Sequence, residues 1–202
     1  MTVNATMRHL LCSLAALAGA VAAAAAAGCS DILRQDRSPV TLVIDRLEAA
    51  SGASGATLTF TGTLQSDVST KGSVLNDTGR VAIRLIMKDA LAAPTVVNGV
   101  TIQRYRVAFR RSDGRNSPGV DVPQPFESAV TFTVAPGAAV SQSFELIRHV
   151  AKQEAPLFSL VRSTIVISTV ADVTFYGHDQ AGNDLSVQGS IGVQFGDFAD
   201  PN

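Results

Sequence analysis

The segment LSVQGSIGVQF, residues 185–195, alternates between two kinds of residue along its whole length. Its odd-numbered positions are apolar or glycine, and its even-numbered positions are serine, glutamine or glycine. Successive side chains of a β-strand point to opposite faces of the sheet, so one face of this segment is apolar. Such alternation is typical of a strand with one buried face. The segment therefore predicts a long strand that covers a hydrophobic core.

The same period of two recurs through the rest of the chain. It is clear over 57–64, 80–88, 101–111 and 126–134, and weaker over 40–47, 140–147 and 164–176. Turn-forming residues separate these segments. Asn98-Gly99 is a hairpin signal, and Gly182-Asn183 separates the last two segments. The sequence therefore predicts about eight strands.

Helices are scarce in this part of the chain, where only 149–162 favours a short helix and Pro156 interrupts it. Strands without helices pack sheet on sheet or close into a barrel. Eight strands with glycine and proline turns predict an all-β fold, a single immunoglobulin-like β-sandwich over residues 39–200. The alternative is a jelly roll or a small barrel. The chain has no Trp and no pair of cysteines after the N-terminal segment, which excludes an antibody-type core.

The N-terminal segment has a different composition. Leu10 to Gly28 carries no charge and is dominated by alanine, and Arg8 precedes it. This layout predicts a secretory signal peptide over residues 1–28. Two alternatives are an ordinary cleavage site at 25–27, which leaves a soluble secreted protein, and an uncleaved membrane helix. The weak hydrophobicity of alanine argues against a permanent membrane span.

The end of this run, Ala26-Ala27-Gly28-Cys29, resembles the lipobox of bacterial lipoproteins. In that family small residues precede an obligatory cysteine, although leucine is usual where Ala26 stands. The resemblance implies cleavage after Gly28 and a lipid anchor of diacylglyceryl and palmitate on Cys29. It also implies a cell-envelope location. Ser30 after the cysteine favours the outer membrane, with the domain on its periplasmic or surface face, over the inner membrane.

Cysteine usage agrees with this interpretation. The chain has two cysteines, and Cys12 leaves with the signal peptide. Cys29 then stands alone, so a disulfide and a cysteine-based zinc site are excluded. Residues 29–38 carry several charges and show no apolar pattern, so they are expected to form a short lipidated tether that Pro39 ends.

The charge of the chain is nearly balanced, with 16 Lys and Arg against 17 Asp and Glu, which does not predict a nucleic-acid partner. A local cationic surface is nevertheless conceivable if strands 80–88 and 101–111 are neighbours. Arginine suits phosphate and carboxylate groups, so such a face could bind an anionic polymer or lipid headgroups. The alternative is that long basic side chains cover an exterior sheet face. The candidates on this face are Arg80, Arg84, Lys88, Arg104, Arg106 and Arg110.

Motifs for catalysis and metal binding are weak. No Gly-x-Ser-x-Gly or His-Glu-x-x-His pattern occurs, and the strand phase directs His178 outward. Enzymatic activity and a cofactor are therefore not expected, although an envelope hydrolase using His149 or His178 is an alternative. Asp179, Asn183 and Asp184 faintly resemble a calcium loop, but Asp and Asn also form tight turns. No metal is predicted there beyond these weak candidates.

The loop over 112–125 is long and contains three prolines, and loops of this length are often functional. It could equally be a crossover connection between the sheets. Taken together, the sequence predicts a non-catalytic binding or structural module whose partner is an envelope polymer or another envelope protein. A carrier of a small ligand or a metal is the alternative. The oligomeric state has no signal in the sequence.

Overall fold

The computed structural model describes residues 37–55, 57–137 and 139–198. The predicted signal peptide and Cys29 lie outside the described residues. Eight strands and four short helical segments make up the described part. The strands are β1 (Val40–Ala50), β2 (Thr63–Asp67), β3 (Asp77–Met87), β4 (Val100–Arg110), β5 (Phe126–Val134), β6 (Val140–Ile147), β7 (Ile167–Asp179) and β8 (Asp184–Gly196). The helical segments are η1 (Gly52–Ser54), η2 (Val96–Asn98), α2 (His149–Lys152) and η3 (Leu157–Leu160).

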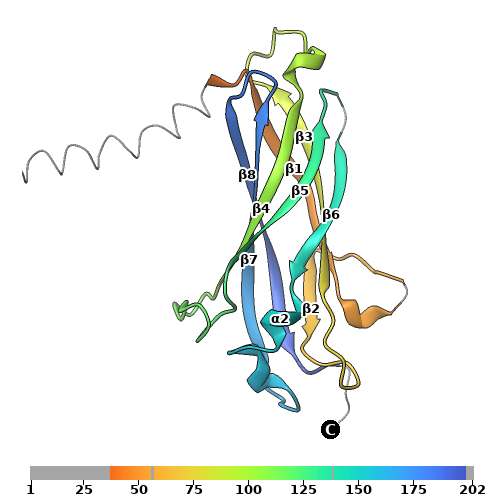
Figure 1. The fold of residues 1–202 in the computed structure, drawn as a ribbon, viewed down its shortest axis with the longest axis vertical. Helices are drawn as coiled ribbons and strands as arrows, with labels where there is room; N and C mark the ends of the chain where they lie inside the picture. Colours follow the sequence, from red (N-terminus) through yellow and green to blue (C-terminus); the bar gives the residue numbers. More distant parts are fainter. Residues whose placement is uncertain (1–36, 56, 138, 199–202) are drawn as a thin grey trace, which may run out of the picture.

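The strands form two sheets that pack face to face (Figure 1). One sheet has the order β1-β3-β6, and the other has the order β2-β8-β7-β4-β5. Neighbours are antiparallel except β2 and β8, which run parallel. The first, third and sixth strands take the places of strands A, B and E of an immunoglobulin sandwich, and the fourth, seventh and eighth those of C, F and G. The all-β sandwich predicted from the alternating segments is therefore confirmed.

The core lies between the two sheets and is centred on aromatic side chains. The Tyr105 ring packs edge-on against Phe144 at 5.1 Å and against Phe126 at 6.2 Å, and Phe144 packs against Phe175 at 5.3 Å between ring centroids. Burial raises the pKa of Tyr105, and its hydroxyl donates a hydrogen bond to the Glu145 carbonyl at 3.0 Å. The odd-numbered apolar residues of β8 from Leu185 to Phe195 point into this core, as their alternation predicts.

The strand predicted over 57–64 is largely wrong, because only Thr63 and Leu64 of this segment belong to β2. The segment crosses from one sheet to the other: Thr61 bridges to Ala49 of β1, and the following residues pair with β8. Phe60 stays outside the core, where the Arg80 guanidinium lies 4.0 Å from its ring centroid. The alternation in this segment therefore does not mark a strand with one buried face, because the segment passes from one sheet to the other.

The two turn predictions have different outcomes. Gly182-Asn183 lies in the tight connection between β7 and β8, as predicted. Asn98-Gly99 does not form a hairpin, because β3 and β4 belong to different sheets. The Asn98 side chain instead accepts a hydrogen bond from the Thr95 backbone N–H at 2.8 Å and so caps η2.

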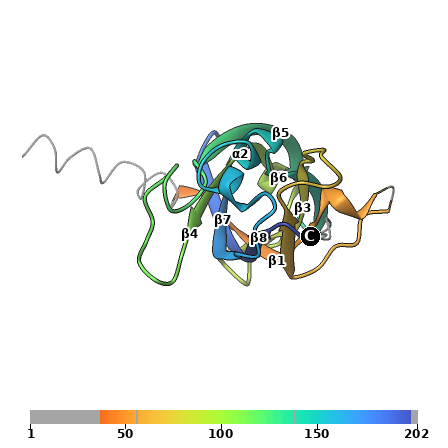
Figure 2. The same cartoon turned by 90° about the horizontal axis from the view of Figure 1, so that it is seen from below.

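The sandwich is elongated and has two distinct ends (Figure 1). At the N-terminal end, the chain enters β1, and the β3–β4 and β7–β8 connections lie beside it. At the opposite, distal end lie the β4–β5 connection over 111–125 and the β6–β7 connection over 148–166, which contains α2 and η3. Figure 2 shows the molecule from this distal end.

Candidate functional site

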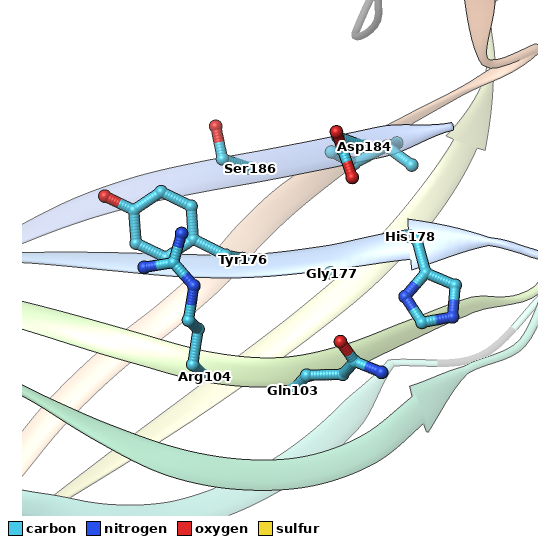
Figure 3. A pocket seen from close by; sticks show the side chains of 8 residues that line it. Gln103, Arg104, Tyr176, Gly177, His178, Asp184 and Ser186 are labelled. Atoms are coloured by element: carbon cyan, nitrogen blue, oxygen red, sulfur yellow. The ribbon is translucent and has the colours of Figure 1, made fainter. Parts of the chain in front are cut away.

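A hollow of about 260 Å³ opens on the outer face of the five-stranded sheet, near the N-terminal end (Figure 3). It forms where the register of β4 against β7 shifts, since Ile102 pairs with Gly177 and Arg104 with Tyr176. Gln103 is therefore the extra residue of a β-bulge, a feature that redirects side chains and often lies next to functional sites. A Cβ atom on Gly177 would overlap the Thr101 carbonyl, so the close approach of the two strands requires glycine there.

The hollow is lined by a stacked pair. The Arg104 guanidinium carbon lies 3.9 Å from the Tyr176 ring centroid, and Figure 3 shows the two groups side by side. Nη1 of Arg104 also donates to Oε2 of Glu127 at 2.8 Å. The cation is thus balanced by a neighbouring carboxylate, and the hollow offers a planar polar wall and not an open positive charge.

The two histidines lie at opposite ends of the sandwich. His178 is the penultimate residue of β7, points outward as predicted, and pairs across the ladder with Asp184 at the rim of the hollow. His149 begins α2 at the distal end, where its Nδ1 lies 2.9 Å from Oδ1 of Asn76. A hydrolase needs a nucleophile within hydrogen-bond reach of its base. The partner of the His149 ring is an amide oxygen.

The five arginines proposed to share one face do not do so. Arg80 and Arg84 belong to β3 in the three-stranded sheet, whereas Arg104, Arg106 and Arg110 belong to β4 in the other sheet. The assumption that these strands are neighbours is wrong, because the connection over 88–99 crosses between sheets.

These arginines also have acidic neighbours on their own faces. The ion pairs are Arg80–Glu48 at 2.8 Å, Arg84–Asp45 at 2.6 Å, Arg104–Glu127 at 2.8 Å, Arg110–Asp172 at 2.7 Å and Arg106–Glu127 at 4.0 Å. Exposed pairs of this kind contribute about 0–1 kcal/mol each to stability. They leave neither sheet with the concentrated positive charge that an anionic polymer needs.

The acidic turn between β7 and β8 is organised by Asp179. Its buried carboxylate accepts hydrogen bonds at 2.9 Å from the backbone N–H groups of Ala181 and Asn183, and at 2.8 Å from the Asn183 side-chain amide. With these bonds, Asp179 and Asn183 stabilise the turn, which is the alternative to a calcium site. Within the described ranges, no three His, Cys, Asp or Glu side chains gather in a way that could hold a metal ion.

Asp179 gives the turn a predictable response to acid. Burial alone would raise the pKa of this carboxyl, but the hydrogen bonds from Asn183, Ser38 and Ala181 outweigh it and lower the pKa below its ordinary value. A carboxyl with a depressed pKa in the folded state contributes stability above its unfolded pKa of about 3.9, and this contribution disappears as the pH falls through the folded pKa.

We expect Asp179→Asn to lower the free energy of unfolding at pH 7 by about 1–3 kcal/mol, because hydrogen bonds to a charged acceptor are lost. The deficit should shrink as the pH falls from about 5 to about 2, because the wild-type carboxylate is then protonated. Urea unfolding curves recorded across this range measure the difference. A deficit that stays constant down to pH 2 would show that the charge of Asp179 has no role.

A second hollow, of about 320 Å³, lies at the distal end. One wall is the β4–β5 connection, which is well supported: Val122 is buried, Gly119 N–H donates to the Val122 carbonyl at 2.7 Å, and Asp121 N–H donates to the Ser117 carbonyl at 2.8 Å. This framework holds the Val120 side chain in solvent, 69% exposed. Since β4 and β5 are neighbours in one sheet, the connection is not the crossover considered as an alternative.

The other wall of the distal hollow comes from the β6–β7 connection. Here Ile165 and Val166 line the hollow and are exposed to solvent, and Phe158 is 65% exposed on the same connection, outside the lining. The segment is nevertheless anchored, because Leu157 and Leu160 of η3 are buried and Lys152 of α2 reaches the interior. Apolar side chains on two supported connections thus form a distal apolar surface around this hollow, composed of Val120, Ile165 and Val166, with Phe158 exposed outside the lining on the same connection.

The charged residues around this surface are paired with one another. Arg111 contacts Asp113 at 2.5 Å, and Arg115 contacts Asp121 at 3.1 Å. The side chain of Arg111 holds the pKa of Asp113 below its ordinary value. Apolar contact is therefore the main interaction that the distal surface offers. Sequence reasoning selected the loop over 112–125 but missed Phe158 and Ile165, whose neighbourhood it assigned to a short helix and a strand.

The fold and these surfaces define an all-β, immunoglobulin-like sandwich with a polar hollow near one end and an apolar surface at the other. Comparison with protein-family models, with curated proteins and with solved structures finds no match for this chain. None of the helices among the described residues is long and apolar enough to cross a membrane.

Proposed function

We propose that this protein is a lipid-anchored lipoprotein of the bacterial envelope that acts as a non-catalytic binding module. Its lipid is attached to Cys29, and outer-membrane anchoring follows from Ser30. The distal apolar surface is its binding site. The observation that supports this proposal most directly is the exposure of apolar side chains on two supported connections at the end farthest from the chain entry.

The chemistry of the distal surface favours a protein partner over a polymer. Soluble proteins rarely expose contiguous apolar patches without a binding role. Val120, Ile165 and Val166 line one hollow, and Phe158 adds an exposed aromatic side chain to the same β6–β7 connection. An anionic polymer would need unpaired cations, whereas Arg111 and Arg115 have acidic partners. We therefore infer that the partner is another envelope protein with an apolar surface.

The position of this surface suits an anchored protein. Loops gathered at one end of an immunoglobulin-like sandwich form binding surfaces, because the rigid sheets hold them in place. The anchor is attached before Arg37, at the opposite end of the elongated domain. The sandwich therefore acts as a spacer that presents the distal surface away from the membrane.

The proposal is tested by crosslinking in intact cells, followed by purification of the protein and identification of what is attached to it. We expect Val120→Asp combined with Ile165→Asp to reduce the captured partner at least about tenfold, since burying two unpaired carboxylates in an apolar contact costs more than the roughly 1.4 kcal/mol that a tenfold loss represents. Both residues are exposed, so the melting temperature should change little.

The matched control places the same kind of change outside the distal surface and outside the β3–β4 connection, in Leu58→Asp combined with Ile86→Asp. This control should retain the partner. Equal capture by the distal variant and the wild type would contradict the proposed site. Loss of capture with Arg104→Ala alone would contradict the distal site as well, because it would assign partner binding to the hollow beside Tyr176.

A further inference from the structure

The connection between β3 and β4, residues 88–99, carries the most exposed apolar side chains among the described residues. Leu91 is 96% exposed and Val96 is 89% exposed, and Val97 lies beside them in solvent. The connection is well supported all the same. Oδ1 of Asp89 accepts a hydrogen bond from the Leu91 N–H at 2.9 Å, and the Thr95–Asn98 cap fixes η2. Apolar side chains that the backbone holds in solvent in this way indicate a surface that is covered in use.

This apolar connection lies directly beside the point where the chain enters the domain (Figure 1). Lys88 N–H donates to the Pro39 carbonyl at 2.9 Å, and Val40 pairs with Met87 at the end of the ladder. Ser38, which precedes Pro39, is buried and hydrogen-bonds to Asp179 in the β7–β8 turn. The entry point and the apolar connection are therefore held together at one end.

Chain geometry limits how far this end can be from a lipid on Cys29. The residues from Cys29 to Arg37 can span at most about 30 Å, since an extended chain covers about 3.3–3.6 Å per residue. The 13 residues of β7 alone extend over about 40 Å at a rise of about 3.3 Å per residue. The N-terminal end can reach the membrane surface on this tether, while the distal end stands well away from it.

We infer that Leu91, Val96 and Val97 insert into the lipid surface and give the domain a second, non-covalent membrane contact that fixes its orientation. This inference rests on the proposed lipid anchor. Exposed charges at the start of the connection have both signs, with Arg37 and Lys88 beside Asp89, so the aliphatic side chains and not net charge carry the membrane contact. The short tether from Cys29 holds this connection, and not the distal surface, within reach of the lipid. Lipid is therefore the occupant that this connection fits.

The chain contains no Trp, so a single introduced Trp reports on one position without background. The test uses the full lipidated protein in vesicles of phosphatidylethanolamine and phosphatidylglycerol, with bromine on the acyl chains as the quencher. We expect Val97→Trp to show blue-shifted emission and a loss of intensity in brominated vesicles. The matched control Val120→Trp, at the distal end, should keep the emission of a Trp in water.

A second variant separates insertion from simple proximity. In the Val97→Trp background, Leu91→Asp combined with Val96→Asp should return the emission to that of the control. Both residues lie in solvent, so folding should be retained. Quenching that persists in this variant overturns the inference. Emission from Val97→Trp that is blue-shifted but not quenched also overturns it, because the connection would then contact protein.

Mass spectrometry of the same preparation distinguishes a failure of the inferred membrane contact from a failure of the proposed lipid anchor. If Cys29 carries its lipid and the indole introduced by Val97→Trp remains in water, the inference fails while the proposed anchor stands. An unmodified Cys29 in protein purified from its native membrane overturns the anchor, and the inference falls with it.

Discussion

Replacing Lys152 with Met is expected to lower the free energy of unfolding by about 3–5 kcal/mol, because it leaves a carboxylate unpaired in the interior. The Lys152 ammonium donates to Oδ2 of Asp77 at 2.9 Å and to the Asp67 carbonyl at 2.9 Å. The side chains of Lys152 and Asp77 are 1% and 0% exposed, so water cannot replace the lost partner. Urea unfolding measures the change, with the midpoint and slope compared between variants.

Two further variants identify the cause of this loss. Arg84→Met removes the cation of an exposed ion pair with Asp45 and should cost no more than about 1 kcal/mol. Adding Asp77→Asn to Lys152→Met should recover part of the stability, because the buried charge disappears. The amide oxygen can still accept from the Gly52 N–H, which lies 2.9 Å from Oδ1 of Asp77 in the wild type. A cost for Lys152→Met as small as that of Arg84→Met would mean that water reaches this pair in solution.

The buried ion pair also connects stability to the proposed binding end. Asp77 begins β3 and accepts a hydrogen bond from Ser66 at the end of β2 at 2.6 Å, whereas Lys152 belongs to α2 in the β6–β7 connection. The pair thus attaches the β6–β7 connection, whose residues Ile165 and Val166 line the distal hollow, to both sheets. This attachment explains how an apolar surface is held in solvent without collapsing onto the core.

The fold class was predictable because alternation is a local property of the sequence. The segment over 185–195 shows which side chains face the core, and β8 has this phase. Alternation does not show to which sheet a strand belongs, and this gap accounts for the main errors. Arg84 and Arg104 share a face only if β3 and β4 are neighbours, whereas the connection between these strands crosses from one sheet to the other. The sheet assignment depends on long-range pairing.

The candidate surfaces were harder to predict than the fold. The hollow beside Tyr176 depends on a bulge at Gln103 and on a close approach at Gly177, neither of which leaves a motif in the sequence. The exposure of Phe158 could not be inferred either, since the neighbouring residue Leu157 is also large and apolar and yet is buried. Nor could the burial of Lys152 be inferred. A lone lysine in a polar segment is expected to lie in solvent, and the segment gives no sign of a buried partner.

Replacing Phe144 with Ala is the second change with a large expected effect, a loss of about 3–5 kcal/mol in the free energy of unfolding. The ring is buried among Tyr105 and Phe175, at 5.1 and 5.3 Å between centroids. It also covers Gly79, its cross-strand partner in the β3–β6 ladder. A Cβ atom on Gly79 would lie 2.8 Å from Cε1 of the ring and would overlap the ring tip.

This contact makes the sign of a glycine substitution depend on the ring. In the wild-type background, Gly79→Ala should cost about 1–3 kcal/mol, because the added methyl group overpacks the core. In the Phe144→Ala background the ring is gone, so the same methyl group fills part of the cavity and removes the cost of glycine within a strand, about 0.5–1 kcal/mol relative to alanine. The substitution should then be neutral or stabilising, and the double-mutant cycle should show a coupling of about 0.5–3 kcal/mol.

Gly192→Ala in β8 is the matched control. Its Cβ would meet only Thr63 Cγ2 at 3.6 Å, so this substitution should show the same small effect in both backgrounds. Additive costs for Gly79→Ala and Phe144→Ala in urea unfolding would contradict this packing, because two groups that occupy the same space cannot act independently.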